Sequence, residues 1–138
     1  MSTTESVNVR RNNVVFTDAA PKPLPVFSQA IKTTDTIYVS GTVGIDPRTG
    51  DLVSGDVKEQ TILKNMKAVL EASGSGLGKV VKVNVFVTDM RDFETINEAY
   101  TGAFEDPQPV EFLLNLPSSF SEILGVKYRG ERGFKVDC

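Results

Sequence analysis

The 138-residue sequence contains no histidine and no tryptophan, and its only cysteine is Cys138. Without histidine the chain cannot build a Ser-His-Asp or Cys-His catalytic group, and with one cysteine a zinc site is not expected either. A single cysteine also cannot form a disulfide within the chain. Any chemistry must therefore rely on carboxylates, hydroxyls, amides, lysines and backbone groups.

Long apolar runs and basic blocks are absent as well. No N-terminal stretch resembles a signal peptide or a membrane span, which predicts no membrane partner and a reducing compartment, the cytoplasm or alternatively the mitochondrion. The formal net charge is −3 with acidic and basic residues interspersed, so we expect no nucleic-acid partner. The length suits one domain, residues 1–138, that needs neither a disulfide nor a metal to fold.

Residues 79–104 carry the clearest structural pattern. Valines alternate with other residues from Val81 to Val87, which is typical of a half-buried strand. Apolar residues then recur at helical spacing from Phe93 to Phe104, and Asp92 stands where an N-cap is expected. The segment is therefore predicted to be a strand, a turn and a helix.

Other segments supply further strands and loops. Residues 14–16 and 36–41 are rich in β-branched and aromatic residues and are predicted strands. Between them, three prolines within residues 21–25 predict an extended loop that could form the wall of a site. Asp46–Gly50 has the composition of a turn and predicts a hairpin.

A second helix is predicted over residues 57–72. Asp56 and Glu59 are spaced as a capping box, and one apolar stripe runs along the segment through Ile62, Met66, Val69 and Leu70. Two one-sided helices and several alternating strands predict an α+β fold with both helices on one face of a mixed or antiparallel sheet. The other face of that sheet would remain apolar, which predicts self-association.

Four stretches together resemble the RidA/YjgF family: FTDAAPKPLPVFSQAI, IYVSGTVGIDPRTGDLVSGD, EQTILKNMKAVLEASG and VVKVNVFVTDMRDFETINEAY. They stand in the family's order and spacing between residues 15 and 104. The resemblance implies a chorismate-mutase-like fold and a homotrimer with a central barrel and clefts between subunits. It also implies hydrolysis of reactive 2-imino acids to 2-keto acids and ammonia, with no cofactor.

The resemblance also implies which residues border the cleft. Phe27 stands where many members have a tyrosine, Ser28 keeps the motif's hydroxyl, Gly41 allows close backbone approach, and Asn97 matches a helix asparagine. Each has a purely structural alternative. Gly41 would then mark a bulge, Ser28 would bond within its loop, and Asn97 would be a solvated helix residue.

The sequence departs from the family after Pro109. Members usually carry an arginine there whose guanidinium holds the substrate carboxylate, whereas direct alignment places Glu111 at that position. Residues 110–124 look like a replacement of the family sequence, in which residues 112–117 are apolar enough for a strand. The substrate site would thus carry a reversed charge.

Family similarity resumes near the C-terminus, where Asp137 occupies the place of the glutamate that positions the attacking water. A carboxylate suits this role because water addition to an imine needs a group that takes its proton. The alternative is an exposed carboxylate with no catalytic part.

Three functions remain open from the sequence. The first is an imine deaminase acting on a small 2-imino acid. The second is a catalytically weak trimer of the same fold that binds small molecules such as 2-keto acids or acts like a chaperone, which the missing arginine favours. The third, a ribonuclease, conflicts with the acidic charge balance.

Overall fold

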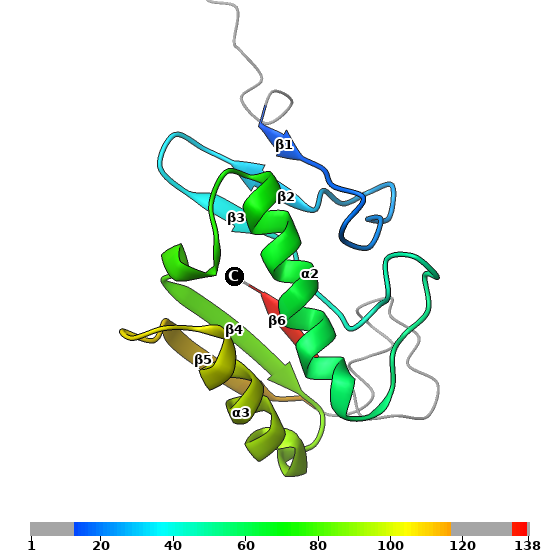
Figure 1. Cartoon of the computed structure of the whole chain (residues 1–138), viewed down its shortest axis with the longest axis vertical. Helices are drawn as coiled ribbons and strands as arrows, with labels where there is room; N and C mark the ends of the chain where they lie inside the picture. Colours follow the sequence, from blue (N-terminus) through cyan, green and yellow to red (C-terminus); the bar gives the residue numbers. More distant parts are fainter. Residues whose placement is uncertain (1–12, 117–133, 138) are drawn as a thin grey trace, which may run out of the picture.

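The computed structural model of the chain describes residues 13–116 and 134–137. This part has an α+β fold in which helices α2 (Lys58–Ala72) and α3 (Phe93–Ala103) lie next to each other in front of the strands (Figure 1). The predicted α+β class is confirmed. Both helices lie within two residues of their expected bounds.

The first sheet is antiparallel and its strands are short. Its order is β1 (Val14–Val15), β2 (Ala30–Lys32) and β3 (Ile37–Val39). Ala30 pairs with Val39, and both side chains are buried. The proline-rich loop after β1 and the glycine after β3 limit these strands, because proline lacks a backbone donor and glycine weakens a strand.

The second sheet is mixed. Its central strand is β4 (Lys82–Val87), which pairs in parallel with β5 (Val110–Asn115) and antiparallel with β6 (Phe134–Asp137). The strand predicted in residues 112–117 is thus present as β5. Among the described strands the ladders form two three-stranded sheets, so the expectation of a single sheet is wrong.

The core lies between the helices and the strands of both sheets. Val83, Val85 and Val87 are at most 1% exposed, and Ile62 and Met66 of α2 are fully buried beside them. The alternating valines therefore form a half-buried strand as predicted. Its first member behaves differently, because Val81 precedes β4 and is 80% exposed.

Asp92 occupies the N-cap position of α3 as predicted, whereas the N-cap of α2 is Val57 and not the predicted Asp56. A short 3₁₀ turn precedes each helix, Gly55–Val57 (η1) before α2 and Met90–Asp92 (η3) before α3. The turn before α3 is capped by Asp89, whose carboxylate accepts a hydrogen bond from Arg91 N, and Asp92 forms no side-chain cap bond. Each added turn moves the first free N–H groups upstream of the predicted cap.

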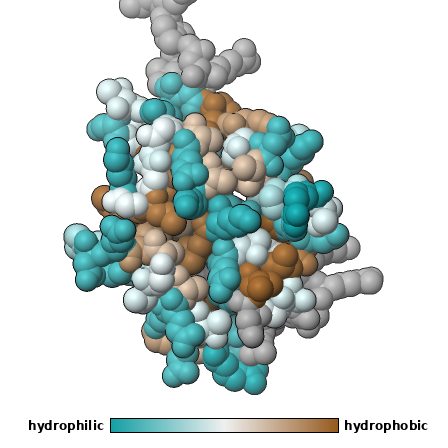
Figure 2. All heavy atoms as spheres, viewed as in Figure 1, coloured by the Kyte–Doolittle hydropathy of each residue, from teal (hydrophilic) through white to brown (hydrophobic). Residues whose placement is uncertain are grey.

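The face of the second sheet away from the helices carries exposed apolar side chains on β5, beside the polar Lys82 and Asn84 of β4. We call Asn84, Phe86, Val110, Phe112 and Leu114 the open face. The β4–β5 register aligns Asn84 with Phe112 and Phe86 with Leu114, and the three β5 residues are exposed. The helix side differs, because hydrophilic residues cover much of it (Figure 2).

Neither helix of the described part combines the length and the hydropathy that a membrane crossing requires.

Candidate functional site

Ser28 and Gly41 are brought together by the first sheet. The β2–β3 register continues beyond its named strands through Ser40, whose N–H donates to Gln29 O at 2.9 Å and whose hydroxyl donates to Ser28 O. Continued two residues beyond the Ala30–Val39 pair, this register would set Ser28 opposite Gly41. Ser28 is half-buried and Gly41 is exposed, so both can be reached from solvent.

Phe27 lies at the end of the proline-rich loop, directly before Ser28. Its N–H donates to Leu24 O at 2.9 Å, which closes a turn, and its ring is 61% exposed. An exposed phenylalanine costs favourable burial unless another surface covers it. The loop thus presents an aromatic ring beside the Ser28–Gly41 pair.

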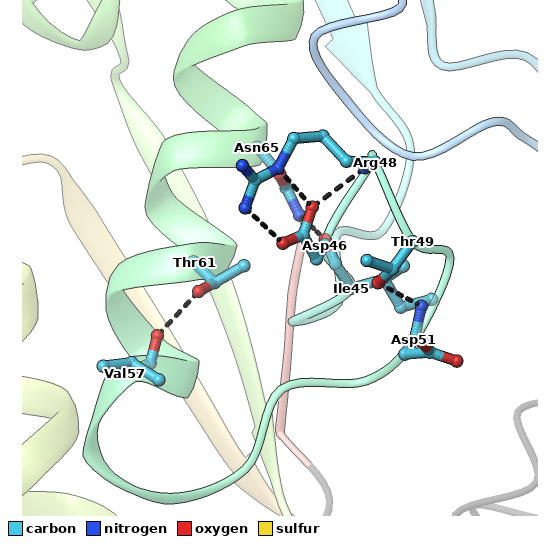
Figure 3. A network of polar contacts seen from close by, with 8 residues as sticks. All are labelled: Ile45, Asp46, Arg48, Thr49, Asp51, Val57, Thr61 and Asn65. Carbon is cyan, nitrogen blue, oxygen red and sulfur yellow. Dashed lines mark hydrogen bonds and ion pairs between the residues drawn. The ribbon is translucent and has the colours of Figure 1, made fainter.

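Two buried amides that we did not predict hold this region. Gln29 bonds to the proline-rich loop, and Asn65 bonds to the hairpin that follows β3. Asn65 is 1% exposed, and its Nδ2 donates to Val43 O at 3.2 Å. The same nitrogen donates to Ile45 O at 2.8 Å (Figure 3). The position of Asn65 beside the apolar stripe of a helix is the sequence signal that could have identified it, because a buried amide needs hydrogen-bond partners.

The hairpin itself forms as predicted. Gly50 N donates to Asp46 O at 2.8 Å across the turn, Ile45 pairs with Leu52, and Gly50 has a φ of 77°. That positive φ explains the glycine, since other residues rarely adopt it.

Asn97 and Glu111 lie on the other side of α2, near Tyr100. Asn97 is half-buried on α3, one turn before Tyr100, and Glu111 is exposed on β5. Burial raises the pKa of the Tyr100 hydroxyl, and the negative charge of Glu111 raises it further. The same hydroxyl donates to Pro109 O at 3.2 Å. The charge of Glu111 therefore influences a side chain of α3.

Asp137 lies in β6, where its backbone pairs with Asn84. Asn84 also pairs with Phe112, so Asp137 belongs to that row of the sheet. Glu111 pairs with Val83 in the neighbouring row. The register therefore does not put the two predicted acids in one row.

The predicted site residues thus form separate groups within one chain. Phe27, Ser28 and Gly41 gather beside the first sheet, whereas Asn97 and Glu111 belong to α3 and the second sheet, and α2 lies between the two regions (Figure 1). Hydroxyl, amide and backbone groups of this kind can bind a small polar acid. Nowhere in the described ranges do three or more His, Cys, Asp or Glu residues cluster as metal ligands would.

Comparison with known proteins identifies the family. The family model Endoribonuclease L-PSP matches residues 17–118. A RutC family protein of Pyrococcus horikoshii is 42% identical over 113 residues, which are 80% of this chain and 90% of that protein. A mouse protein named 2-iminobutanoate/2-iminopropanoate deaminase is 43% identical over 98 residues, which are 70% of this chain and 73% of that protein.

Solved structures agree with this assignment. The crystal structure of RidA from Psychrobacter sp. PAMC 21119 superposes with a TM-score of 0.77 at 30% sequence identity, and the match covers 90% of this chain and 94% of that one. The order of motifs, the fold and the sequence similarity all point the same way, and the chain belongs to the RidA/YjgF family, whose family model bears the name Endoribonuclease L-PSP.

Proposed function

We propose that the chain is a homotrimeric, cofactor-free deaminase that hydrolyses small 2-imino acids to 2-keto acids and ammonia. The observation that carries this proposal is the 43% identity to the mouse protein named 2-iminobutanoate/2-iminopropanoate deaminase. The chemistry also suits a chain without histidine, because an imine carbon is electrophilic enough to react with a positioned water.

In the proposed reaction, water adds to the C2 carbon of the imine and the imine nitrogen takes up a proton. The resulting carbinolamine collapses to a carbonyl group and releases ammonia, so one water is consumed for each ammonia formed. Asp137 would orient the water and accept its proton, acting as general base. Ser28, the Gly41 backbone and Asn97 would hold the substrate, with the Phe27 ring against it.

The trimer part of the proposal follows from the open face and from the separated site groups. Val110 and Phe112 are 67% and 52% exposed, and large apolar patches on a sheet usually mark an interface. Packing three copies through their open faces would bury these side chains. A neighbouring subunit could also supply the Asn97 group that lies across α2 from Ser28 and Gly41.

The remaining expectations concern partners and place. We expect neither nucleic acid nor membrane to bind, and we expect the protein to act in the cytoplasm, or alternatively in the mitochondrion. Glu111 lowers the expected rate, because a carboxylate near the site repels the substrate carboxylate.

The decisive test is the decay of 2-iminobutanoate, generated in situ and followed by trapping of the remaining imine. We expect the wild-type chain to accelerate decay, Asp137→Asn to abolish the acceleration, and Asp137→Glu to retain or increase it. Equal rates for all three forms would remove Asp137 from the mechanism. Binding of 2-oxobutanoate without any acceleration would instead support the non-catalytic trimer, and RNA cleavage would support the ribonuclease.

A further inference from the structure

Gln29 is a buried amide whose side chain is fully engaged by one loop. It is 6% exposed, and its Oε1 accepts a hydrogen bond from Thr17 N at 2.7 Å. Its Nε2 donates to Thr17 O at 2.9 Å and to Pro21 O at 3.0 Å. A single side chain therefore satisfies three backbone groups from a segment 8 to 12 residues upstream.

Besides Gln29, the clearest anchor of this loop among the described residues is Ala20, which is 3% exposed in the core. Residues 17–25 contain prolines at 21, 23 and 25, which have no backbone N–H to donate. The loop ends at Phe27, so its position decides where that exposed ring lies. Fixing both ends of such a segment limits the conformations open to it.

Gln29 also joins the loop to the site through its backbone. Its carbonyl accepts from Ser40 N at 2.9 Å, and it directly follows Ser28. Gln29 therefore contacts the loop through its side chain and Ser40, which precedes Gly41, through its backbone.

We propose that Gln29 is the positioning residue of the substrate site, fixing the 17–27 loop and its Phe27 ring before the substrate binds. This inference rests on the proposed function, because it assigns the loop to the site of imine hydrolysis. Binding to a site that is already ordered avoids the cost of ordering the loop. If loss of the side-chain bonds leaves the loop ordered in roughly a tenth of molecules, the apparent dissociation constant rises about tenfold.

The main test compares wild type with Gln29→Met, which keeps the length of the side chain and removes its hydrogen bonds. The full-length chain is assayed for 2-iminobutanoate hydrolysis, and KM and kcat are determined separately. We expect KM to rise about tenfold with kcat changed less than about twofold, because the bound complex has the same geometry once formed. Ser73→Ala serves as a matched control, since it also removes a buried hydrogen bond, from Ser73 Oγ to Val69 O at the end of α2. Its KM should be unchanged.

A second variant tests the hydrogen bonds themselves. In Gln29→Glu the ionised side chain can still accept from Thr17 N but faces two carbonyl oxygens without a donor, whereas the protonated form regains one donor. The ratio of its KM to that of wild type should therefore fall as the pH is lowered. A packing defect alone would leave that ratio independent of pH. If Gln29→Met does not fold, Gln29→Asn, which keeps the amide one methylene nearer the backbone, replaces it in the comparison.

Hydrogen exchange of the peptide containing residues 17–27 separates failure of this inference from failure of the proposed function. We expect faster exchange at Thr17 N and Phe27 N in Gln29→Met than in wild type. Faster exchange with an unchanged KM would overturn the positioning role and leave the deaminase intact. Unchanged exchange would show that Gln29 does not hold the loop. If wild type is inactive and exchange is still faster in the variant, both the deaminase proposal and the positioning role are overturned. Gln29 would then only hold the 17–27 loop in place.

Discussion

The two faces of β4 differ in burial, although their residues alternate along one six-residue strand. On the helix side Val83, Val85 and Val87 are buried within one protomer, whereas Asn84 and Phe86 on the open face are only half-buried. The open face continues onto β5 with exposed apolar residues. One face of the sheet is thus buried within the chain, whereas apolar side chains of the other face are exposed in the described part.

The largest effect on stability is expected from a substitution on the helix side of the second sheet. Ile62→Ala removes a fully buried side chain between α2 and the sheet and should lower the free energy of unfolding by about 2–5 kcal/mol. Denaturant unfolding at two protein concentrations should give the same loss at both. Phe112→Ala on the open face is the matched comparison, and its loss should depend on protein concentration, because it acts through association. Equal behaviour of the two variants would contradict the difference between the faces.

The next effect concerns assembly. Phe112→Asp places a charge in the open face and should dissociate the proposed trimer, because burying an unpaired carboxylate is costly. Light scattering should then give a mass near the 15.0 kDa of one chain, where wild type gives about three times as much. Gln60→Asp, at an exposed position on α2, adds the same charge outside the open face and should leave the trimer intact. A trimeric Phe112→Asp variant would rule out this interface.

A smaller effect is expected from position 111, where direct alignment with the family places the usual arginine. Glu111→Arg should raise 2-imino acid hydrolysis roughly tenfold to a hundredfold, because a charged hydrogen bond to the substrate carboxylate contributes about 1.5–3 kcal/mol. Glu111→Gln, which removes only the repulsion, should give a smaller gain.

The same variants offer a readout that does not depend on activity. The charge of Glu111 contributes to the raised pKa of Tyr100, so Glu111→Arg should lower that pKa, as an ultraviolet titration of the phenol would show. A lowered Tyr100 pKa with no change in hydrolysis or 2-oxobutanoate binding would mean that residue 111 faces α3 and not the substrate.

Local patterns predicted the elements well. The stripe from Ile62 to Leu70 is buried as its spacing indicates, and the alternation in β4 identifies the strand, since both signals depend on residues close in sequence. The predicted cap of α2 was wrong because a 3₁₀ turn precedes that helix, and Asp92 takes the N-cap position of α3 without a side-chain cap bond. Glu59 of the predicted capping box is buried, and its Oε2 has no hydrogen-bond partner.

The candidate site could be predicted only in part. Phe27 and Ser28 are neighbours in sequence, and Gly41 joins Ser28 through the antiparallel register of two adjacent strands. Gln29 and Asn65 escaped prediction because their partners lie 8 to 22 residues away in irregular segments. No periodicity links such residues; only the folded chain brings them together.

The smallest effect is expected at a turn that belongs to neither face. The Asp46 carboxylate accepts hydrogen bonds from the side chain and from the backbone N–H of Arg48, and these contacts lower the pKa of Asp46 from 3.8 to about 2. Because its pKa is lowered, Asp46 stabilises the fold when the pH is above the ordinary pKa of a carboxylate. This contribution is lost as the pH falls from about 4 toward 2. The Arg48 side chain is 86% exposed, so water and salt screen the pair and little stability depends on it. Arg48→Met should therefore return the Asp46 pKa toward 3.8 in a carboxylate NMR titration while the unfolding midpoint at neutral pH barely moves. In Phe112→Asp the Asp46 pKa should stay near that of wild type, because the turn is closed by its own residues; a large shift there would place the turn at the subunit contact and enlarge the interface beyond the open face.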